Sequence, residues 1–163
     1  MDAAVVRAMA RWPRVPAVYG WLSLDRRGNW LLREPAGGFG RIGNAFLRDF
    51  IARNYAADER GCWYFQNGPQ RVFVALAYAP FVLHYRGATL VDHCGEAVSV
   101  RETCLDEEGS VLMRVARGVG LLDDRDLEAF ASRHADWDAL PRVRRPDVAA
   151  RFGFVPQPAD SLR

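Results

Sequence analysis

Lysine is missing from this chain. All 22 of its basic residues other than histidine are arginine, in a sequence of 163 residues. The absence excludes chemistry that needs a lysine amine, such as a Schiff base with pyridoxal phosphate, and it excludes the lysine of a phosphate-binding loop. It also excludes the lysine that pairs with ATP in a protein kinase. Codon usage in a GC-rich genome explains the bias, and the exclusions hold whatever its origin.

Cysteine and long apolar runs are scarce as well. The three cysteines, Cys62, Cys94 and Cys104, lack the spacing of a disulfide framework, which agrees with a reducing compartment. No apolar run approaches the ~20 residues that a membrane-spanning helix needs. The opening MDAAVVRAMARWPRVP has Asp2 and an arginine inside its short apolar stretch, unlike a secretory signal. We therefore expect a cytoplasmic protein that does not engage a membrane.

A strong charge imbalance is also lacking. The chain has 22 basic and 20 acidic residues, which give a net charge of +2 at pH 7. Because nucleic-acid affinity depends on a concentrated basic surface, the mixing of arginine with acidic residues argues against nucleic acid as the partner. An arginine patch assembled only in the folded chain keeps a nucleic-acid binder as an alternative.

The composition is otherwise that of an ordinary globular protein. Half of the residues are hydrophobic and 26% are charged, and 163 residues are typical of one domain. We expect a single domain over residues 1–163, with residues 155–163 as a loose tail.

One segment has a clear helical pattern. In IGNAFLRDFIARNYAAD, the apolar residues Ile42, Phe46 and Phe50 recur every four positions, with charged residues between them. This spacing predicts one amphipathic helix over about 42–57. The segments AAVVRAMAR and DLEAFASRH predict short helices near the two ends of the chain.

The remaining segments indicate strands joined by turns. Asp-x-x-Gly, typical of a type I turn, occurs at Asp25–Gly28, Asp58–Gly61 and Asp106–Gly109. WLSLDRRGNWLL and ETCLDEEGSVLM resemble each other as hairpins, through either duplication or recurrent turn chemistry. We expect an α+β fold with a mostly antiparallel sheet of roughly six to eight strands and the 42–57 helix packed on it.

The most informative stretch is QNGPQ, which lies between two apolar runs. Asn67-Gly68 is typical of a two-residue hairpin turn, but Pro69 would then occupy the position whose N–H closes the turn, and proline has no N–H. We therefore expect a wider loop from Gln66 to Gln70.

This loop and its neighbours are the predicted binding site. Aromatic rings, amides and arginine at one surface combine stacking with directed hydrogen bonds. On the competing interpretation, the rings fill the core and the amides bond to backbone groups. The candidate binding residues are Trp63, Gln66, Asn67, Gln70 and Arg71.

A metal site is the alternative. Zinc or iron needs three or four donors that converge from neighbouring elements, and His84, His93 and Glu96 lie on successive predicted strands. None of the usual ligand spacings is present, and a histidine bonded to a neighbouring carboxylate explains the same residues. We predict no metal, no cofactor and no catalytic residue, and keep a metal-dependent enzyme using these three residues as the alternative.

The central segment FIARNYAADERGCWYFQNGPQRVFVALAYAP resembles a family of short uncharacterised bacterial proteins of unknown function. The resemblance covers about the central half of the chain and implies a bacterial origin, without any catalytic residue. The sequence thus favours a non-catalytic binding or protein-interaction module. Its partner would be another protein or a small ligand, and exposed strand edges would allow a homodimer.

Overall fold

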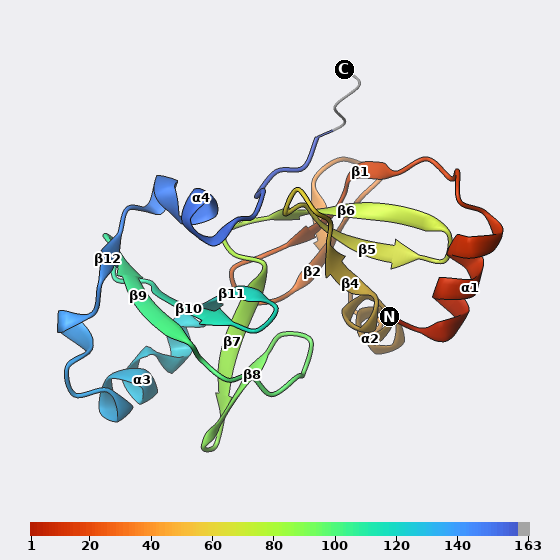
Figure 1. Ribbon diagram of the computed structural model, residues 1–163. Helices are drawn as coiled ribbons and strands as arrows, with labels where there is room; N and C mark the ends of the chain where they lie inside the picture. Colours follow the sequence, from red (N-terminus) through yellow and green to blue (C-terminus); the bar gives the residue numbers. More distant parts are fainter. Residues whose placement is uncertain (160–163) are drawn as a thin grey trace. The chain divides into compact units, whose positions relative to one another are not determined.

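The computed structural model describes residues 1–159, which form an α+β fold with two mixed, mostly antiparallel sheets (Figure 1). Contacts divide them into two compact units. The first unit contains Met1–Asp25, Asn29–Ala77 and the chain from Phe154 on, and the second contains Arg26–Gly28 and Tyr78–Gly153. The predicted fold class is confirmed, although the strands form two sheets instead of one. That the whole chain is a single domain stays a prediction.

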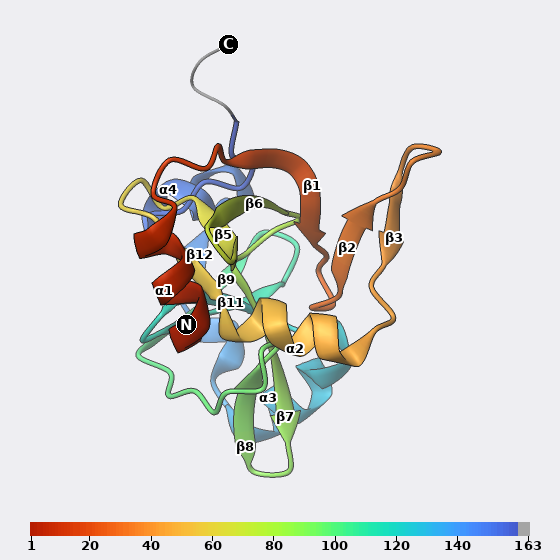
Figure 2. The same cartoon turned by 90° about the vertical axis from the view of Figure 1, so that its right-hand side faces the viewer.

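The first unit holds two helices and a six-stranded sheet in the order β3-β2-β1-β6-β5-β4. Neighbouring strands are antiparallel except β1 and β6, which are parallel. Strands β2 and β3 form an arm that projects from the rest of the unit (Figure 2). The elements are α1 (Ala3–Arg11), β1 (Val18–Leu24), β2 (Trp30–Arg33), β3 (Phe39–Arg41), α2 (Ala45–Arg53), β4 (Tyr55–Ala57), β5 (Trp63–Asn67) and β6 (Gln70–Leu76).

Helix α2 is shorter than the predicted helix over about 42–57. It begins after Asn44, whose side chain accepts a hydrogen bond from the Leu47 N–H at 3.0 Å. It ends at Asn54, whose Nδ2 donates to the Phe50 carbonyl at 2.9 Å. The next residues then pair with β5 as strand β4. Side-chain capping at both ends therefore limits the helix, although the apolar spacing continues beyond it.

The second unit has a six-stranded sheet in the order β12-β9-β10-β11-β7-β8. The pairs β11–β7 and β12–β9 are parallel, and the other neighbours are antiparallel. The elements are β7 (Phe81–Arg86), β8 (Thr89–Asp92), β9 (Glu102–Asp106), β10 (Val111–Val115), β11 (Gly118–Leu122), α3 (Leu127–Arg133), β12 (Arg142–Val143) and α4 (Val148–Phe152), with 3₁₀ turns at Asp124–Asp126, Trp137–Ala139 and Arg145–Asp147.

The two sheets share a strand order. The run β2-β1-β6-β5-β4 in the first unit corresponds to β8-β7-β11-β10-β9 in the second, and the second and third strands of each run are parallel. The segments WLSLDRRGNWLL and ETCLDEEGSVLM form β1–β2 and β9–β10, which hold different places in this order. The two hairpins therefore do not correspond in the shared strand order, which favours recurrent turn chemistry over duplication.

Four loops have one Asp-x-x-Gly arrangement. In each, Oδ1 of the aspartate accepts a hydrogen bond from the backbone N–H four residues later, at 2.7 to 3.0 Å. The glycine has φ between +79° and +91°, a region that glycine enters without steric cost. Three of these loops were predicted as turns, and the fourth joins β8 to the residues after it. The aspartates are Asp25, Asp58, Asp92 and Asp106.

The end of the described chain is bound to the first unit. The Val155 N–H donates to the Gly61 carbonyl at 3.0 Å, and the Pro156 carbonyl accepts from the Leu76 N–H at 2.8 Å. The first residues of the predicted loose tail are therefore hydrogen bonded to the first unit. Residues 160–163 lie outside the described residues. Within residues 1–159, no helix is both long and apolar enough to cross a membrane.

Candidate functional site

Strands β5 and β6 are joined by a tight turn, so the prediction of a wide loop over residues 66–70 is wrong. Asn67 pairs with Gln70, which leaves only Gly68 and Pro69 between the strands. Gly68 has φ +57°, as at the first central position of a type II′ turn. The residue that must donate the closing hydrogen bond is then Gln70 and not Pro69. The sequence interpretation placed the turn one residue too early.

This register separates the predicted binding residues. Gln66 lies opposite Arg71 on one face of the hairpin, and Asn67 lies opposite Gln70 on the other. Trp63 is buried, with its ring 4.7 Å from the ring of Tyr55. The five residues therefore do not form one surface: two pairs border different hollows and Trp63 belongs to the core.

The hollow beside Gln66 and Arg71 is called the α1-side pocket. It has a volume of about 480 Å³ and includes residues of α1, of the segment that follows α1, and of β1, β5 and β6. Its lining includes Trp12, Pro13, Tyr19, Gln66, Arg71 and Phe73. A volume of 300 to 1,000 Å³ is typical of small-molecule sites.

The aromatic residues that line the α1-side pocket are Trp12, Tyr19 and Phe73. Tyr19 and Phe73 are stacked with their ring centroids 4.6 Å apart and an angle of 11° between planes. Tyr64 meets the edge of Phe73, with a centroid distance of 6.0 Å. The Arg71 guanidinium carbon lies 4.0 Å from the centre of the Tyr64 ring. Tyr19, Phe73, Tyr64 and Arg71 thus form one continuous packed series.

The two arginines of the pocket differ in their partners. Arg60 forms an ion pair with Asp58 at 3.3 Å, and hydrogen bonds with Tyr19 and Asp58 raise the pKa of its guanidinium. Within the described residues, Arg71 contacts the Tyr64 ring and has no carboxylate partner. The charge of Arg60 is therefore balanced inside the protein, whereas that of Arg71 is not.

Gln66 is buried with one polar atom left over. Only 2% of its surface is exposed, and its Nε2 donates to the Gly68 carbonyl at 2.9 Å. That bond sets the orientation of the amide. Its Oε1 then has no hydrogen-bond donor within the described part of the chain. Because burying an unsatisfied acceptor costs about 1–3 kcal/mol, such an atom needs an explanation.

The hollow on the other face, the α2-side groove, is smaller and more apolar. It has a volume of about 260 Å³, and Asn67 and Gln70 contribute its only amide side chains. Trp21 lines it and is 54% exposed, which is unusual for a residue of this size. Its lining includes Trp21, Leu32, Leu47, Phe65, Asn67 and Gln70.

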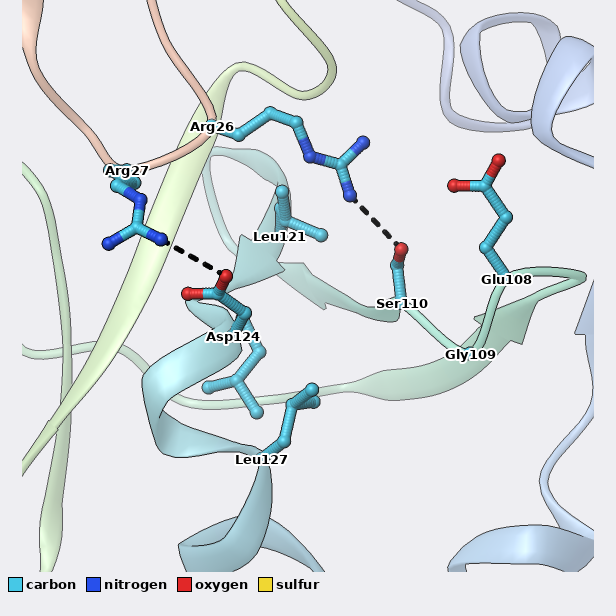
Figure 3. Close-up of a pocket in the computed structure, with 9 residues that line it drawn as sticks. Arg26, Arg27, Glu108, Gly109, Ser110, Leu121, Asp124 and Leu127 are labelled. Carbon is cyan, nitrogen blue, oxygen red and sulfur yellow. Dashed lines mark hydrogen bonds and ion pairs between the residues drawn. The ribbon is translucent and has the colours of Figure 1, made fainter.

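A third pocket, of about 360 Å³, lies in the second unit (Figure 3). Arg26 donates to the Ser110 hydroxyl at 3.1 Å, and Arg27 pairs with Asp124 at 3.3 Å. Glu108, at its rim, pairs with Arg145 at 2.7 Å. The charged groups of this pocket already have protein partners, so it offers a ligand less than the α1-side pocket does.

The residues of the metal alternative are not assembled as a ligand set. The Nδ1 of His84 lies 3.6 Å from Asp123, and the Nδ1 of His93 accepts from the Val82 N–H at 3.3 Å. Glu96 donates its N–H to Asp92 in one of the Asp-x-x-Gly loops. Among residues 1–159, no group of three or more His, Cys, Asp or Glu side chains is placed to hold a metal ion.

Comparisons with known proteins identify a family and a fold. A family model, DUF2944, described as "Protein of unknown function (DUF2946)", matches residues 1–159. No protein of curated function matches the chain. A crystal structure of a DUF1285 family protein from Silicibacter pomeroyi DSS-3 is similar, with a TM-score of 0.53 and 15% identity over 81% of this chain and 84% of the other.

A second similar structure is that of a DUF1285 family protein from Shewanella baltica OS155. Its TM-score is 0.50, with 16% identity over 68% of this chain and 90% of the other. At these identities the likeness concerns the fold alone. The family match agrees with the resemblance of the central segment to proteins of unknown function.

The sequence interpretation missed part of the α1-side pocket. Trp12, Pro13 and Tyr19 line it, yet none of the three is among the predicted binding residues. They reach Gln66 and Arg71 through the parallel pairing of β1 with β6, whose partners Val18 and Val72 are far apart in sequence. No local pattern signals this proximity.

Proposed function

Since the chain belongs to the DUF2944 family, which is described by its unknown function, its own geometry must indicate its role, and we propose that it is a non-catalytic binding module. The α1-side pocket is its ligand site. The observation that carries the proposal is the buried Oε1 of Gln66, an acceptor without a donor beside a hollow of about 480 Å³. A ligand that donates to this atom would remove the cost of burying it.

The state of the nucleophilic side chains supports a non-catalytic role. The three cysteines form no disulfide. Burial raises the pKa of the Cys94 thiol to about 12, and it also raises the pKa values of Cys62 and Cys104. Since the thiolate is the reactive form, these cysteines are weak nucleophiles at neutral pH.

The proposal includes a cytoplasmic location and a small ligand as the partner. Pairing of two copies through strand edges is part of it too, and the molecular mass in solution tests this point. If the partner is instead a protein, its contact would be the α2-side groove, where Trp21 is exposed beside Asn67 and Gln70.

Affinity selection from a metabolite extract tests the ligand site. We expect the purified protein to retain a small molecule, and Gln66→Leu and Arg71→Gln to reduce that retention by about tenfold or more, because each loses a directed contact. The matched control is Gln70→Ala, on the opposite face of the same hairpin. Its Nε2 makes one long, exposed hydrogen bond of 3.5 Å to the Pro16 carbonyl, so the variant should retain the molecule like the wild type.

Two results would contradict the proposal. One is that no small molecule is retained. The other is that Gln70→Ala abolishes retention while Gln66→Leu does not, which would move the site to the α2-side groove.

Stability separates a ligand-binding role of Gln66 from a structural one. Gln66→Leu should change the free energy of unfolding by no more than about 1 kcal/mol in either direction, since it removes a buried acceptor that has no donor and also the hydrogen bond from Nε2 to the Gly68 carbonyl. Urea denaturation without ligand measures this change. A loss of several kcal/mol would instead mean that the amide serves the hairpin.

A further inference from the structure

The charges of the α1-side pocket limit the charge of its ligand. Arg60 is balanced by Asp58, so among residues 1–159 the positive charge of the pocket that has no carboxylate partner is that of Arg71. The Arg71 guanidinium carbon lies 4.0 Å from the centre of the Tyr64 ring, a contact that uses the charge of the group, and a guanidinium can bind a carboxylate through two of its N–H donors. A single uncompensated cation fits a singly charged acid better than a phosphate, which carries about −1.5 to −2 at neutral pH.

The walls limit the shape of the ligand. Tyr19 and Phe73 stack on each other and Phe73 is only 3% exposed, so the aromatic surface open to a ligand comes from Tyr19 and from Trp12, which is 50% exposed. Aromatic groups favour offset stacking or edge contacts with such rings. A flat ring system therefore gains contact on more than one wall of the pocket.

Gln66 indicates that the ligand carries a hydrogen-bond donor. Its Oε1 can only accept a hydrogen bond, so a ligand group that meets it must be an N–H or an O–H. A binding site with a buried hydrogen-bonding group binds a ligand that pairs with this group much more tightly than a ligand of the same shape that cannot pair with it.

From these three features we infer that the α1-side pocket binds a small aromatic carboxylic acid whose ring system carries an N–H or O–H donor. The carboxylate meets Arg71, the ring lies against Trp12 and Tyr19, and the donor meets Gln66 Oε1. The inference rests on the proposed function and specifies the class of its ligand.

Three matched probes test the inference by isothermal titration. Indole-3-acetate carries the ring, the N–H and the carboxylate; naphthalene-1-acetate lacks the N–H; indole-3-ethanol lacks the charge. We expect indole-3-acetate to bind with a millimolar or lower Kd. Each of the other two should bind about tenfold more weakly, which corresponds to the loss of one directed contact of about 1.4 kcal/mol.

Variants assign each probe group to its residue. Gln66→Leu should remove the preference for indole-3-acetate over naphthalene-1-acetate. Arg71→Gln should remove the preference for indole-3-acetate over indole-3-ethanol. Gln70→Ala, on the other face of the hairpin, should leave all three affinities unchanged.

The outcomes separate the inference from the proposed function. If indole-3-ethanol binds as well as the acid and Gln66→Leu weakens it, the pocket binds ligands but the inferred charge is wrong. If none of the three binds, or if binding is insensitive to both variants, the inferred ligand class is overturned. In that case the selection from the metabolite extract still tests the proposed function. If the protein retains no molecule from the extract, the proposed function is wrong as well.

Discussion

Tyr78 and Asp106 form a buried hydrogen bond in the second unit. The Tyr78 hydroxyl donates to Asp106 Oδ2 at 2.6 Å, and both residues are buried. Burial alone raises the pKa of Asp106, but hydrogen bonds from Tyr78 and Ser110 outweigh it and hold the pKa below the ordinary value of 3.8. Burial and the same contact raise the pKa of Tyr78.

Tyr78→Phe should therefore destabilise the protein in a pH-dependent way. A carboxylate whose pKa is lower in the folded state stabilises it above pH 3.8, and this contribution disappears as the pH falls through the folded-state value. At pH 7 we expect a loss of about 1.5–3 kcal/mol, which is typical of a hydrogen bond to a charged group. The loss should shrink below about pH 4.

Urea denaturation of the variant and the wild type at several pH values measures this difference. Tyr85→Phe is the matched control, since within the described residues the Tyr85 ring contacts Arg133 and its hydroxyl has no hydrogen-bond partner. An equal loss in both variants, or a loss that does not change with pH, would be inconsistent with a bond to an ionised Asp106.

The Asp-x-x-Gly loops are the clearest link between sequence and structure at the scale of elements. Each places a carboxylate on the backbone N–H groups of the loop and a glycine at positive φ, so four residues specify the local path of the chain. This explains why hairpin turns at three of these sites could be predicted without any knowledge of the fold.

Glycine 109 offers a direct test of that loop chemistry. Its φ is +83° and no atom lies within 4 Å of an added Cβ, so Gly109→Ala should cost about 1 kcal/mol through backbone strain alone. Gly109→Asn should cost less, because asparagine enters this region more readily. Gly43→Ala, at an equally open site without positive φ, should be near neutral.

Thermal unfolding of the three variants measures these differences. Equal destabilisation by alanine and asparagine at Gly109 would argue against positive φ as the reason for glycine there. Destabilisation by Gly43→Ala of the same size would argue that general loop entropy is responsible.

At the scale of the whole molecule, the first unit is completed by the end of the described chain. Phe154 is 7% exposed, and Val155 and Pro156 hydrogen bond to Gly61 and Leu76. The first unit is therefore discontinuous in sequence, and residues after Gly153 contribute to its core.

Phe154→Ala should lower the stability of the first unit. Truncation of a buried phenylalanine costs about 3–5 kcal/mol, towards the lower value where the site can collapse. Tryptophan fluorescence reports this unit, because four of the five tryptophans lie in it. The control is Gln157→Ala, at an exposed residue whose Nε2 makes only a long hydrogen bond of 3.4 Å to the Leu76 carbonyl, and it should shift the transition far less. An unchanged midpoint for Phe154→Ala would mean that the first unit folds without this segment.

The sequence by itself determined the features that depend on neighbouring residues. The absence of lysine excludes its chemistry, and Asp-x-x-Gly encodes three of the turns. The α+β class and the amphipathic helix follow from the same local periods. The ends of that helix and the turn at Gly68 were misplaced because capping and register depend on contacts that the periods do not specify.

Only the tertiary structure decided the division into two sheets and the composition of the α1-side pocket. Trp12 and Tyr19 meet Gln66 and Arg71 because β1 pairs in parallel with β6. Parallel strands need a long connection, so their pairing depends on the burial of apolar surface over the whole unit. No short stretch of sequence therefore predicts it.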